Sequence, residues 1–463
     1  MSIENETKDM KLTAKASPKE IAAFAIYGGG NGIFNYMLNS FGNYFYTNVV
    51  GINAMVTGFF MTICKIIDFF TDLLMGTLID KGQNKSGEKA RPWLKRAMIP
   101  GSIGLILMFS APFATERASL IWAIATYFIA TSIGFTMNII PYQTMMPLIS
   151  GERVSRTKLE ASYGIIAMAI SLVAGICVEP LATALGGGRK GWLMTACILA
   201  VVALILHLIG YLGTKEHVRI DSPVTEKISY TEVLKQVGLL LKNKYWVLIA
   251  LFTIINSLST MSAAMMYYVQ YVMGDFSVLA YVMVVMMVPP MVMMAIAPMI
   301  VAKFGKGTVI RFGSLAMLVG AIIVWSSATA SAFYIGVILL AFGQGGATAT
   351  MISFLGDSID YGEYKFGVRT DGIGVSLNVS LQKIAQACAS LLLGAILTVG
   401  GYDANAFEQT ASSVTAIKIA FCGVPMLIAV GLFIISIFMN IEKKYPDLPE
   451  ELAKMRLERS ANK

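Results

Sequence analysis

The chain has 463 residues, of which 56% are hydrophobic and only 14% are charged, and its formal net charge is +8 at pH 7. Because soluble domains carry about 25% charged residues, this composition excludes a chain of ordinary soluble domains and indicates a protein that crosses a membrane several times. The five cysteines are scattered through apolar segments and the histidines number only two, so we expect neither a disulfide framework nor a zinc or histidine-based metal site.

Twelve segments are long and apolar enough for membrane-spanning helices, which need roughly 20 residues each. In chain order they are expected at about 21–50, 53–80, 97–114, 119–148, 160–185, 191–213, 245–273, 276–302, 308–328, 331–358, 371–400 and 414–440. The expected fold class is therefore an all-α membrane protein with twelve transmembrane helices. An even number of spans puts both termini on the same side.

The longest polar interval among these segments divides the spans into two sets of six, a plan that resembles the two halves of the major facilitator superfamily. The expected organisation is a tail at 1–20, a six-helix half at 21–213, a central loop at 214–244, a second six-helix half at 245–440 and a tail at 441–463.

Lysine and arginine are distributed unequally between the two sides of this topology. Of the 36, 30 fall on the side of the tails and the central loop, and three, Arg117, Arg189 and Lys190, fall on the other. Positively charged loops stay in the cytoplasm, so both termini are expected there. Topology accounts for the basic charge, and no nucleic-acid partner is expected.

The stretch "KIIDFFTDLLMG", 65–76, brings three charges into an apolar span. Asp68 and Asp72 are four residues apart and share a helix face, and Lys65 falls on the same stripe. Charged residues inside a membrane usually face a cavity and pair with one another. The one negative charge in excess predicts a site for an alkali cation or a proton, with the hydroxyl of Thr71 as a further oxygen. The alternative is a lysine–aspartate pair that only holds helices together.

A second charge lies inside the span at 371–400. Lys383, in "LNVSLQKIAQ", is about a dozen residues into that span. It is the expected partner of the excess carboxylate. An ammonium that competes with a bound cation would couple ion occupancy to conformation.

Four asparagines in "NGIFNYMLNSFGN", 31–43, recur every four residues and form one polar stripe on the first span. Amides donate and accept hydrogen bonds, so a cavity wall for a hydroxyl-rich ligand is one interpretation, and hydrogen bonding between helices is the other. The expected substrate-binding residues are Asn31, Asn35, Asn39, Phe135, Asn138, Gln143, Thr348, Asn378 and Gln382.

The glycine-rich stretch "GQGGATAT", 343–350, lies within an apolar span and lacks the strand, loop and lysine of a phosphate-binding loop. Close helix packing or a narrow permeation path is expected there. Without an ATP motif, uphill transport would draw on an ion gradient. No nucleophile–base arrangement is visible either, so the chain is not expected to be an enzyme.

Several segments resemble the glycoside–pentoside–hexuronide:cation symporter family. The most specific are "KIIDFFTDLLMGTLIDKG" followed by "RPW", and "DSIDYGEYKFGVR" at 357–369; "NYFYTNVVGI" and "GERVSRTKLEASYG" are also similar. The resemblance covers about residues 20–440. It implies the twelve-helix major facilitator fold and symport of a sugar or glycoside with Na⁺, Li⁺ or H⁺.

The resemblance also implies roles for particular residues. The paired cation-site aspartates of the family fall on Asp68 and Asp72, a neighbouring polar ligand on Thr71 and a further possible ligand on Thr136. The lysine at the junction of the cation and sugar sites falls on Lys383. The segment 360–365, with Asp360, Tyr361 and Glu363, would form a cytoplasmic loop against a gate, and Arg369 after it is the fourth expected gate residue; a solvated charged loop is the alternative.

The chain departs from the melibiose permease, the family's best-known type, where charges hold the galactoside. A Lys–Asp pair of the first span is Asn31-Gly32 here, an aspartate of the fourth span is Ile139, and an arginine of the fifth span is Gly164. The tryptophan after the fourth-span proline is Gln143. A larger or less polar glycoside, a uronide or a sulfonated sugar therefore fits the sequence better than a galactoside.

The expected protein is a cation-coupled symporter of a sugar-like solute in a bacterial inner membrane. It would work as a monomer in the lipid bilayer, with a coupling ion and no cofactor. A lipid or lysolipid translocator of the same fold and a non-transporting solute sensor are the alternatives.

Overall fold

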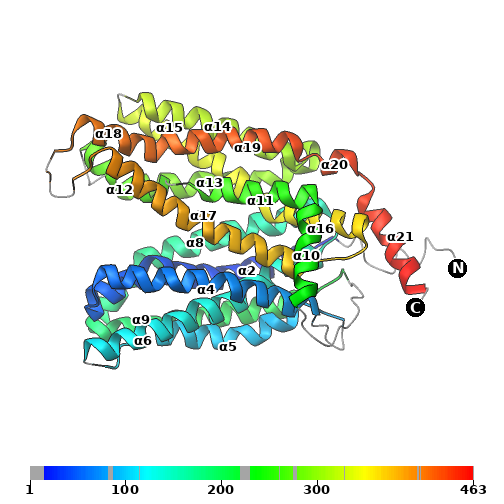
Figure 1. Cartoon of the computed structure of the whole chain (residues 1–463), viewed down its shortest axis with the longest axis horizontal. Coiled ribbons are helices and arrows are strands. Elements are labelled where there is room, and N and C mark those ends of the chain that lie inside the picture. Colours follow the sequence, from blue (N-terminus) through cyan, green and yellow to red (C-terminus); the bar gives the residue numbers. More distant parts are fainter. Residues whose placement is uncertain are drawn as a thin grey trace. The chain divides into compact units, whose positions relative to one another are not determined.

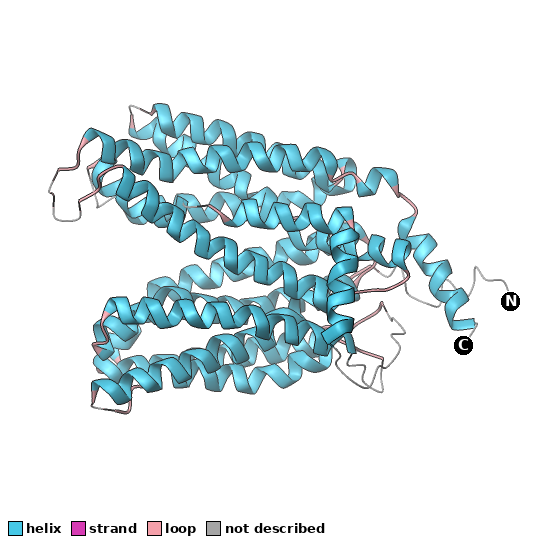
Figure 2. Ribbon diagram, in the orientation of Figure 1, coloured by secondary structure: helices cyan, strands magenta, loops and turns pink. Residues whose placement is uncertain are grey.

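The computed structural model describes residues 15–81, 87–113, 115–218, 230–259, 261–274, 279–327, 329–403, 406 and 408–461. Within these ranges every regular element is a helix and there is no strand, as Figures 1 and 2 show. This agrees with the expected all-α fold.

The first six expected spans coincide with helices. They are α2 (Pro18–Tyr36) continued by η1 (Met37–Phe41), α3 (Gly42–Tyr44) and η2 (Phe45–Val50); α4 (Ala54–Lys81); α5 (Arg91–Met108); α6 (Glu116–Phe128) continued by η3 (Ile129–Phe135) and α7 (Thr136–Ile149); α8 (Arg153–Ala184); and α9 (Gly188–Gly213). The η segments are π-helical turns, which widen a helix locally and shift the faces that follow.

The remaining helices contain the other six expected spans. They are α10 (Tyr230–Lys242), α11 (Lys244–Ser257), α12 (Met261–Tyr268), η4 (Val269–Met273), α13 (Leu279–Phe304), α14 (Lys306–Ser326), α15 (Ala330–Thr348), α16 (Met351–Phe366), α17 (Asp371–Val399), α18 (Ala411–Lys418), η6 (Ile419–Gly423), α19 (Val424–Phe438), α20 (Ile441–Lys444) and α21 (Leu448–Ala461). Three of these, α10, α20 and α21, lie in the expected central loop and C-terminal tail.

Eight helices of the described residues are long and apolar enough to cross a membrane, and a ninth results if the bent pair at 234–242 and 244–257 forms one span. The expected spans outside this set are the first three. They are helical, but polar side chains lower their hydropathy, among them the asparagine stripe of α2 to η2 and Lys65, Asp68 and Asp72 within α4.

The chain divides into two compact units. The first unit comprises Met1–Asn243, Leu355–Ser380 and Asp447–Lys463, and the second comprises Lys244–Phe354 and Leu381–Pro446. The division passes through α16 and α17, so the beginning of α17 and most of α16 belong with the N-terminal helices.

Aromatic side chains form a hydrophobic core in the first unit. Phe45, Phe109 and Trp192 are buried there together with Tyr46 and Tyr127. The Phe109 and Trp192 rings stack with centroids 5.9 Å apart. This core joins α9 to helices of the first, third and fourth spans.

Glycines allow close helix packing in the second unit. A Cβ at Gly343 on α15 would lie 2.3 Å from the carbonyl oxygen of Gly313 on α14, and one at Gly345 would lie 2.6 Å from Cα of Pro290 on α13. Any larger residue would force these helices apart. Of the two interpretations of 343–350, the structure supports close packing.

A glutamate holds the start of the third span in each half. The Glu216 carboxylate accepts hydrogen bonds from the backbone N–H groups of Lys89, Ala90 and Arg91 at 2.7–2.9 Å. In the second unit, Glu442 accepts from the backbone N–H of Lys306 at 2.8 Å. Both carboxylates satisfy N–H groups that a helix N-terminus leaves without partners. Burial raises the pKa of Glu216 above its ordinary value, although the three N–H donors act in the opposite direction.

The expectation of a loop at 360–365 is wrong, because α16 continues to Phe366. The solvated alternative is wrong as well, since Asp360, Tyr361 and Glu363 are buried. Asp357, Asp360 and Glu363 recur every three residues along one side of the helix and meet arginines of the first unit. Because arginines pair with these carboxylates, the charged residues can be buried as part of the helix, and α16 continues beyond the apolar part of the sequence.

Candidate functional site

Asp68 and Asp72 lie one turn apart on α4, and both carboxylates are buried, with 5% and 0% of the residues exposed. The hydrophobic neighbours Phe59, Ile66 and Phe70 are exposed on the same helix. The charged residues therefore face the interior of the first unit, and the apolar residues face outward.

Two hydroxyls of the fourth span meet the two carboxylates. Ser132 donates to Oδ1 of Asp68, and Thr136 donates to Oδ1 of Asp72 at 2.7 Å. Each pair is separated by 64 positions, so α4 and the fourth span run parallel here. Two carboxylates one turn apart thus face two hydroxyls one turn apart.

The fourth span changes its helical form at this point. Ser132 lies in the π-helical η3 and Thr136 begins α7. Between them, Gly134 approaches α5 so closely that a Cβ would lie 3.1 Å from Cα of Gly101. The glycine lets the span pack tightly against α5 while both hydroxyls face α4.

A third hydroxyl comes from α17, which runs antiparallel to α4. Asp80 accepts from the backbone N–H groups of Gly372 and Ile373, and a Cβ at Gly76 would lie 2.3 Å from Oγ of Ser376. One turn further, Oγ of Ser380 is 3.4 Å from Oδ2 of Asp72.

Two other residues expected at the cation site are placed differently. The hydroxyl of Thr71 donates to the backbone carbonyl of Asp68 at 3.1 Å instead of facing the carboxylates. Lys65 is exposed, whereas both aspartates are buried.

Sequence reasoning missed Ser132 and Ser380. A signal for Ser132 was present, because it precedes Thr136 by four residues, as Asp68 precedes Asp72. Ser380 carried no comparable signal, since its position depends on the register between α4 and α17.

The asparagine stripe divides into a buried and an exposed part. Asn31 is buried and its Oδ1 lies 3.2 Å from Nε2 of His207 on α9. Asn35 and Asn39 are exposed and hydrogen-bond to each other at 2.8 Å. Asn31 therefore joins helices, and the outer pair is accessible in the first unit.

Asn138 is occupied by contacts between helices. Its side chain donates to the carbonyls of Gly134 and Ala97 at 2.8 and 3.3 Å, and accepts from the hydroxyl of Tyr27 at 3.0 Å. These bonds join α2, α5 and the fourth span. They are the hydrogen bonding between helices that the sequence offered as the alternative to substrate binding.

The remaining candidates are distributed over both units. Gln143 and Asn378 are buried in the first unit, and Phe135 is half-buried against its aromatic core. Thr348, Gln382 and Lys383 belong to the second unit. On α17, Lys383 follows Ser380 by three residues.

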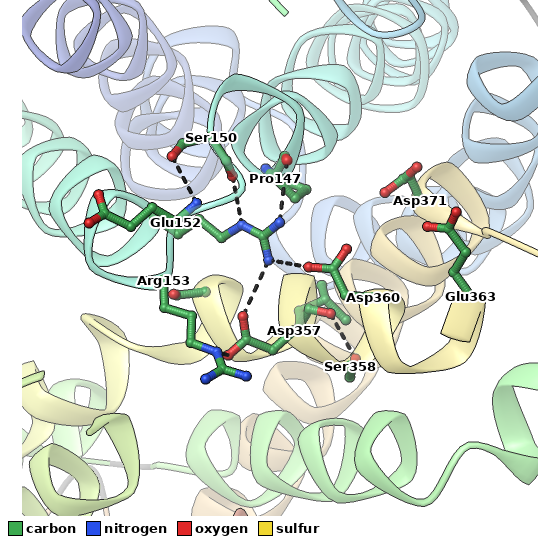
Figure 3. Close-up of polar contacts among 12 residues, drawn as sticks. Pro147, Ser150, Glu152, Arg153, Asp357, Ser358, Asp360, Glu363 and Asp371 are labelled. Carbon is green, nitrogen blue, oxygen red and sulfur yellow. Dashed lines mark hydrogen bonds and ion pairs between the residues drawn. The ribbon is translucent and has the colours of Figure 1, made fainter. Parts of the chain in front are cut away.

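A network of buried ion pairs lies along one side of α16 in the first unit (Figure 3). Arg156 on α8 is 1% exposed and donates to Asp357 at 3.2 Å and to Asp360 at 2.7 Å. It also donates to the backbone carbonyls of Ser150 and Pro147. A buried arginine is stable only when its N–H groups are satisfied in this way.

Arg369 continues the network between α16 and α17. It pairs with Asp360, Glu363 and Asp371, the last two at 3.0 and 2.7 Å. Burial alone would lower the pKa of Arg369, but the three carboxylates raise it above its ordinary value. Arg456 on α21 also pairs with Glu363. All four predicted gate residues are therefore in or beside this network, and the C-terminal helix joins it.

Residues 23–443 match the family model described as MFS/sugar transport protein, where MFS denotes the major facilitator superfamily. The chain belongs to this family. Membership confirms the expected family and makes the chain a membrane transporter and not an enzyme. It also supports the major facilitator interpretation of the twelve helical segments.

Two relatives illustrate the similarity of sequence within the MFS/sugar transport protein family. The isoprimeverose transporter of Lactiplantibacillus pentosus is 28% identical over 432 residues, which cover 90% of this chain and 88% of the relative. The putative glycoside/cation symporter YagG of Escherichia coli (strain K12) is 27% identical over 420 residues, which cover 89% and 90%.

Solved structures of transporters share the fold. The E. coli fucose:proton symporter FucP superimposes with a TM-score of 0.66 at 12% identity, over 91% of this chain and 97% of that one. At this identity the similarity establishes the major facilitator fold alone.

Proposed function

We propose that this protein is a cation-coupled symporter of a glycoside or related sugar derivative. The cation binds between α4 and the fourth span, both in the first of the two six-helix halves. Alternating access results from rocking of these halves. The cation and the solute favour each other's binding through a coupling free energy that is reciprocal.

The proposal of a cation site rests on one observation, which is that Asp68 and Asp72 face the hydroxyls of Ser132 and Thr136. Hard, weakly polarisable oxygens suit alkali cations, and sulfur or imidazole ligands are missing from this set. Burial strengthens the attraction between the carboxylates and a cation, because little water screens it. Na⁺ and Li⁺ fit this donor set, and a proton on one carboxylate is the alternative.

The named relatives support a glycoside as the transported solute, because one is an isoprimeverose transporter and another a putative glycoside/cation symporter. The exposed amides of Asn35 and Asn39 suit hydroxyl-rich ligands. A uronide or sulfonated sugar would additionally use the ammonium of Lys383. We assign this lysine the role of coupling the cation to the solute.

The ion network is proposed to act as a gate. Arg156 and Arg369 fasten the end of α16 to α8 and to the start of α17. Rocking of the halves would have to break or rearrange these pairs. Their strength would therefore set the balance between the two orientations of the transporter.

The proposed setting is the inner membrane of a bacterium, with both termini in the cytoplasm and the protein acting as a monomer. The basic residues of the tails and of the central loop support this orientation.

The test is uptake by purified protein in proteoliposomes, with labelled glycosides, pentosides, uronides and sulfonated sugars and with Na⁺ and pH gradients imposed separately. Symport predicts accumulation of one solute class above its external concentration, driven by one of the gradients. Flipping of labelled lysolipid without any sugar flux would contradict the proposal in favour of a lipid translocator. Sugar binding without flux would indicate a sensor.

A further inference from the structure

Ser132 has a contact that neither the family resemblance nor the predicted ligand set includes. Its hydroxyl donates to the carboxylate of Asp68 and lies 3.5 Å from that of Thr131. We propose that Ser132 is a ligand of the transported alkali cation and sets its affinity. This inference rests on the proposed function, since it concerns the same cation site.

The geometry gives Ser132 the same place beside Asp68 that Thr136 has beside Asp72. The two hydroxyls belong to one span and are four residues apart, and their partners are four residues apart on α4. Both serine and threonine are buried, at 2% exposure each. If Thr136 is a ligand, the position of Ser132 makes it an equivalent one.

The hydroxyl group can serve as a donor and a ligand together. It carries one hydrogen and two lone pairs, so it donates to the carboxylate while a lone pair faces the ion. A buried alkali ion loses most of its water and needs further oxygens to complete its coordination shell. Neutral hydroxyls supply these oxygens without the additional buried negative charge that more carboxylates would bring. Ser132, Thr136 and Ser380 each place a hydroxyl within reach of these carboxylates.

The π-helical turn supplies an independent observation. η3 ends at Phe135, so it places Ser132 on a widened turn and Thr136 on the first residue of a regular helix. Single π-helical segments inside longer helices are frequent at functional sites. Here the widened turn is the one that carries the hydroxyl facing Asp68.

The experiment measures cation binding and cation-driven uptake for wild type, Ser132→Ala and Ser132→Thr. Binding is followed as the shift in melting temperature that Na⁺ or Li⁺ produces in detergent-purified protein, because a ligand that binds the folded state stabilises it. Uptake is followed as the Na⁺ concentration that gives half-maximal transport. Ser314→Ala is the matched control, since Ser314 is a buried serine of α14 whose hydroxyl donates to the carbonyl of Ile310.

We expect Ser132→Ala to raise the half-maximal Na⁺ concentration about tenfold or more, the effect of losing one interaction with a charged group. The Na⁺-dependent shift in melting temperature should shrink in parallel. Ser132→Thr keeps the hydroxyl and should restore both, while Ser314→Ala should match wild type.

Three outcomes would overturn the inference. Ser132→Ala with wild-type Na⁺ dependence would exclude a ligand role, and equal destabilisation with and without Na⁺ would assign the serine to helix packing alone. A wild-type protein that shows no response to Na⁺ or Li⁺ would exclude an alkali-cation ligand. The proposed function fails separately, if the wild-type protein accumulates no glycoside or related sugar under either an imposed Na⁺ gradient or an imposed pH gradient.

Discussion

At the scale of single residues, the placement of buried polar groups separates functional from structural side chains. Asp68 and Asp72 meet hydroxyls from another span, and such neutral donors stabilise a carboxylate without cancelling its charge. Asn138, by contrast, uses its amide to join three helices. Both are buried polar residues in apolar spans, and only their partners distinguish them.

The first prediction concerns Asp72. Asp72→Asn removes the negative charge but preserves the volume and hydrogen-bonding capacity of the side chain. Ion-driven accumulation should be lost, whereas binding and exchange of the solute should persist at reduced affinity. Counterflow and gradient-driven uptake in the same proteoliposomes measure the two activities. Undiminished uphill uptake would contradict the assignment of the cation site.

The second prediction compares two asparagines. Asn138→Ala leaves the hydroxyl of Tyr27 and two buried carbonyls without their partner, so it should lower the free energy of unfolding by about 1–3 kcal/mol. Asn35→Leu should instead weaken solute binding with little loss of stability, because Asn35 is exposed. Denaturation and equilibrium binding measure the two effects. If Asn35→Leu changes only stability, the exposed asparagines do not bind the solute.

At the scale of elements, a glutamate that follows the last span of each six-helix half caps the N-terminus of the third span of that half. Glu216 follows α9 and caps α5, and Glu442 follows α19 and caps α14. In each half, a carboxylate after the sixth span holds the beginning of the third.

The third prediction follows from these caps. Glu216→Ala leaves three backbone N–H groups without an acceptor and should lower the free energy of unfolding by about 1–3 kcal/mol. Thermal melting in detergent measures the change, with Glu408→Ala as the control because Glu408 is exposed. Equal melting temperatures for the two variants would show that the cap does not stabilise the fold.

At the scale of the whole molecule, the ion network lies within the first unit and joins segments far apart in the chain. Arg156 and Arg369 join α16 and the start of α17 to the N-terminal helices, and Arg456 adds α21. Residues 355–380 and 447–463 belong to that unit and not to the second one.

The fourth prediction is a double-mutant cycle on Arg156 and Asp360. Each single change removes one charged hydrogen bond but leaves the remaining charge another partner, Asp357 for Arg156 and Arg369 for Asp360, so it should cost about 1.5–3 kcal/mol. Arg156→Gln with Asp360→Asn together should cost less than the sum of the two single changes. Unfolding in denaturant measures stability, and uptake measures the accompanying change in turnover. Additive effects would exclude a direct interaction that matters energetically.

The fifth prediction tests coupling through Lys383. In the coupling role proposed for Lys383, Lys383→Ala should lower the number of cations transported per solute or abolish transport, because the ammonium charge is lost. The measurement is the ratio of initial cation and solute fluxes. Lys418→Ala is the control, because it also removes a lysine from the second unit, but at the last residue of α18 and not in the middle of α17. A wild-type ratio in Lys383→Ala would refute the proposed role.

Much of the fold was predictable from sequence because each membrane span needs its own run of about 20 apolar residues and forms its backbone hydrogen bonds within its own helix. Apolar length predicts the helix, and a spacing of four residues predicts that Asp68 and Asp72 share a face, since both depend on local geometry alone. The same local reasoning failed for 360–365. Its charges suggested an exposed loop, whereas Arg156, 204 positions from Asp360 in the chain, pairs with that carboxylate inside the protein. Arg456, 93 positions from Glu363, pairs with the second carboxylate.

The sequence by itself therefore determined the helices, their apolar and charged faces and the carboxylate pair of α4. Only the tertiary structure decided that Ser132 and Ser380 meet that pair, that Asn31 and Asn138 are used between helices, and that the segment after 358 is a buried helix. The physical reason is the range of the interactions. Helix faces follow from neighbours along the chain, whereas the partner of a buried polar group depends on the register between helices that are far apart in sequence.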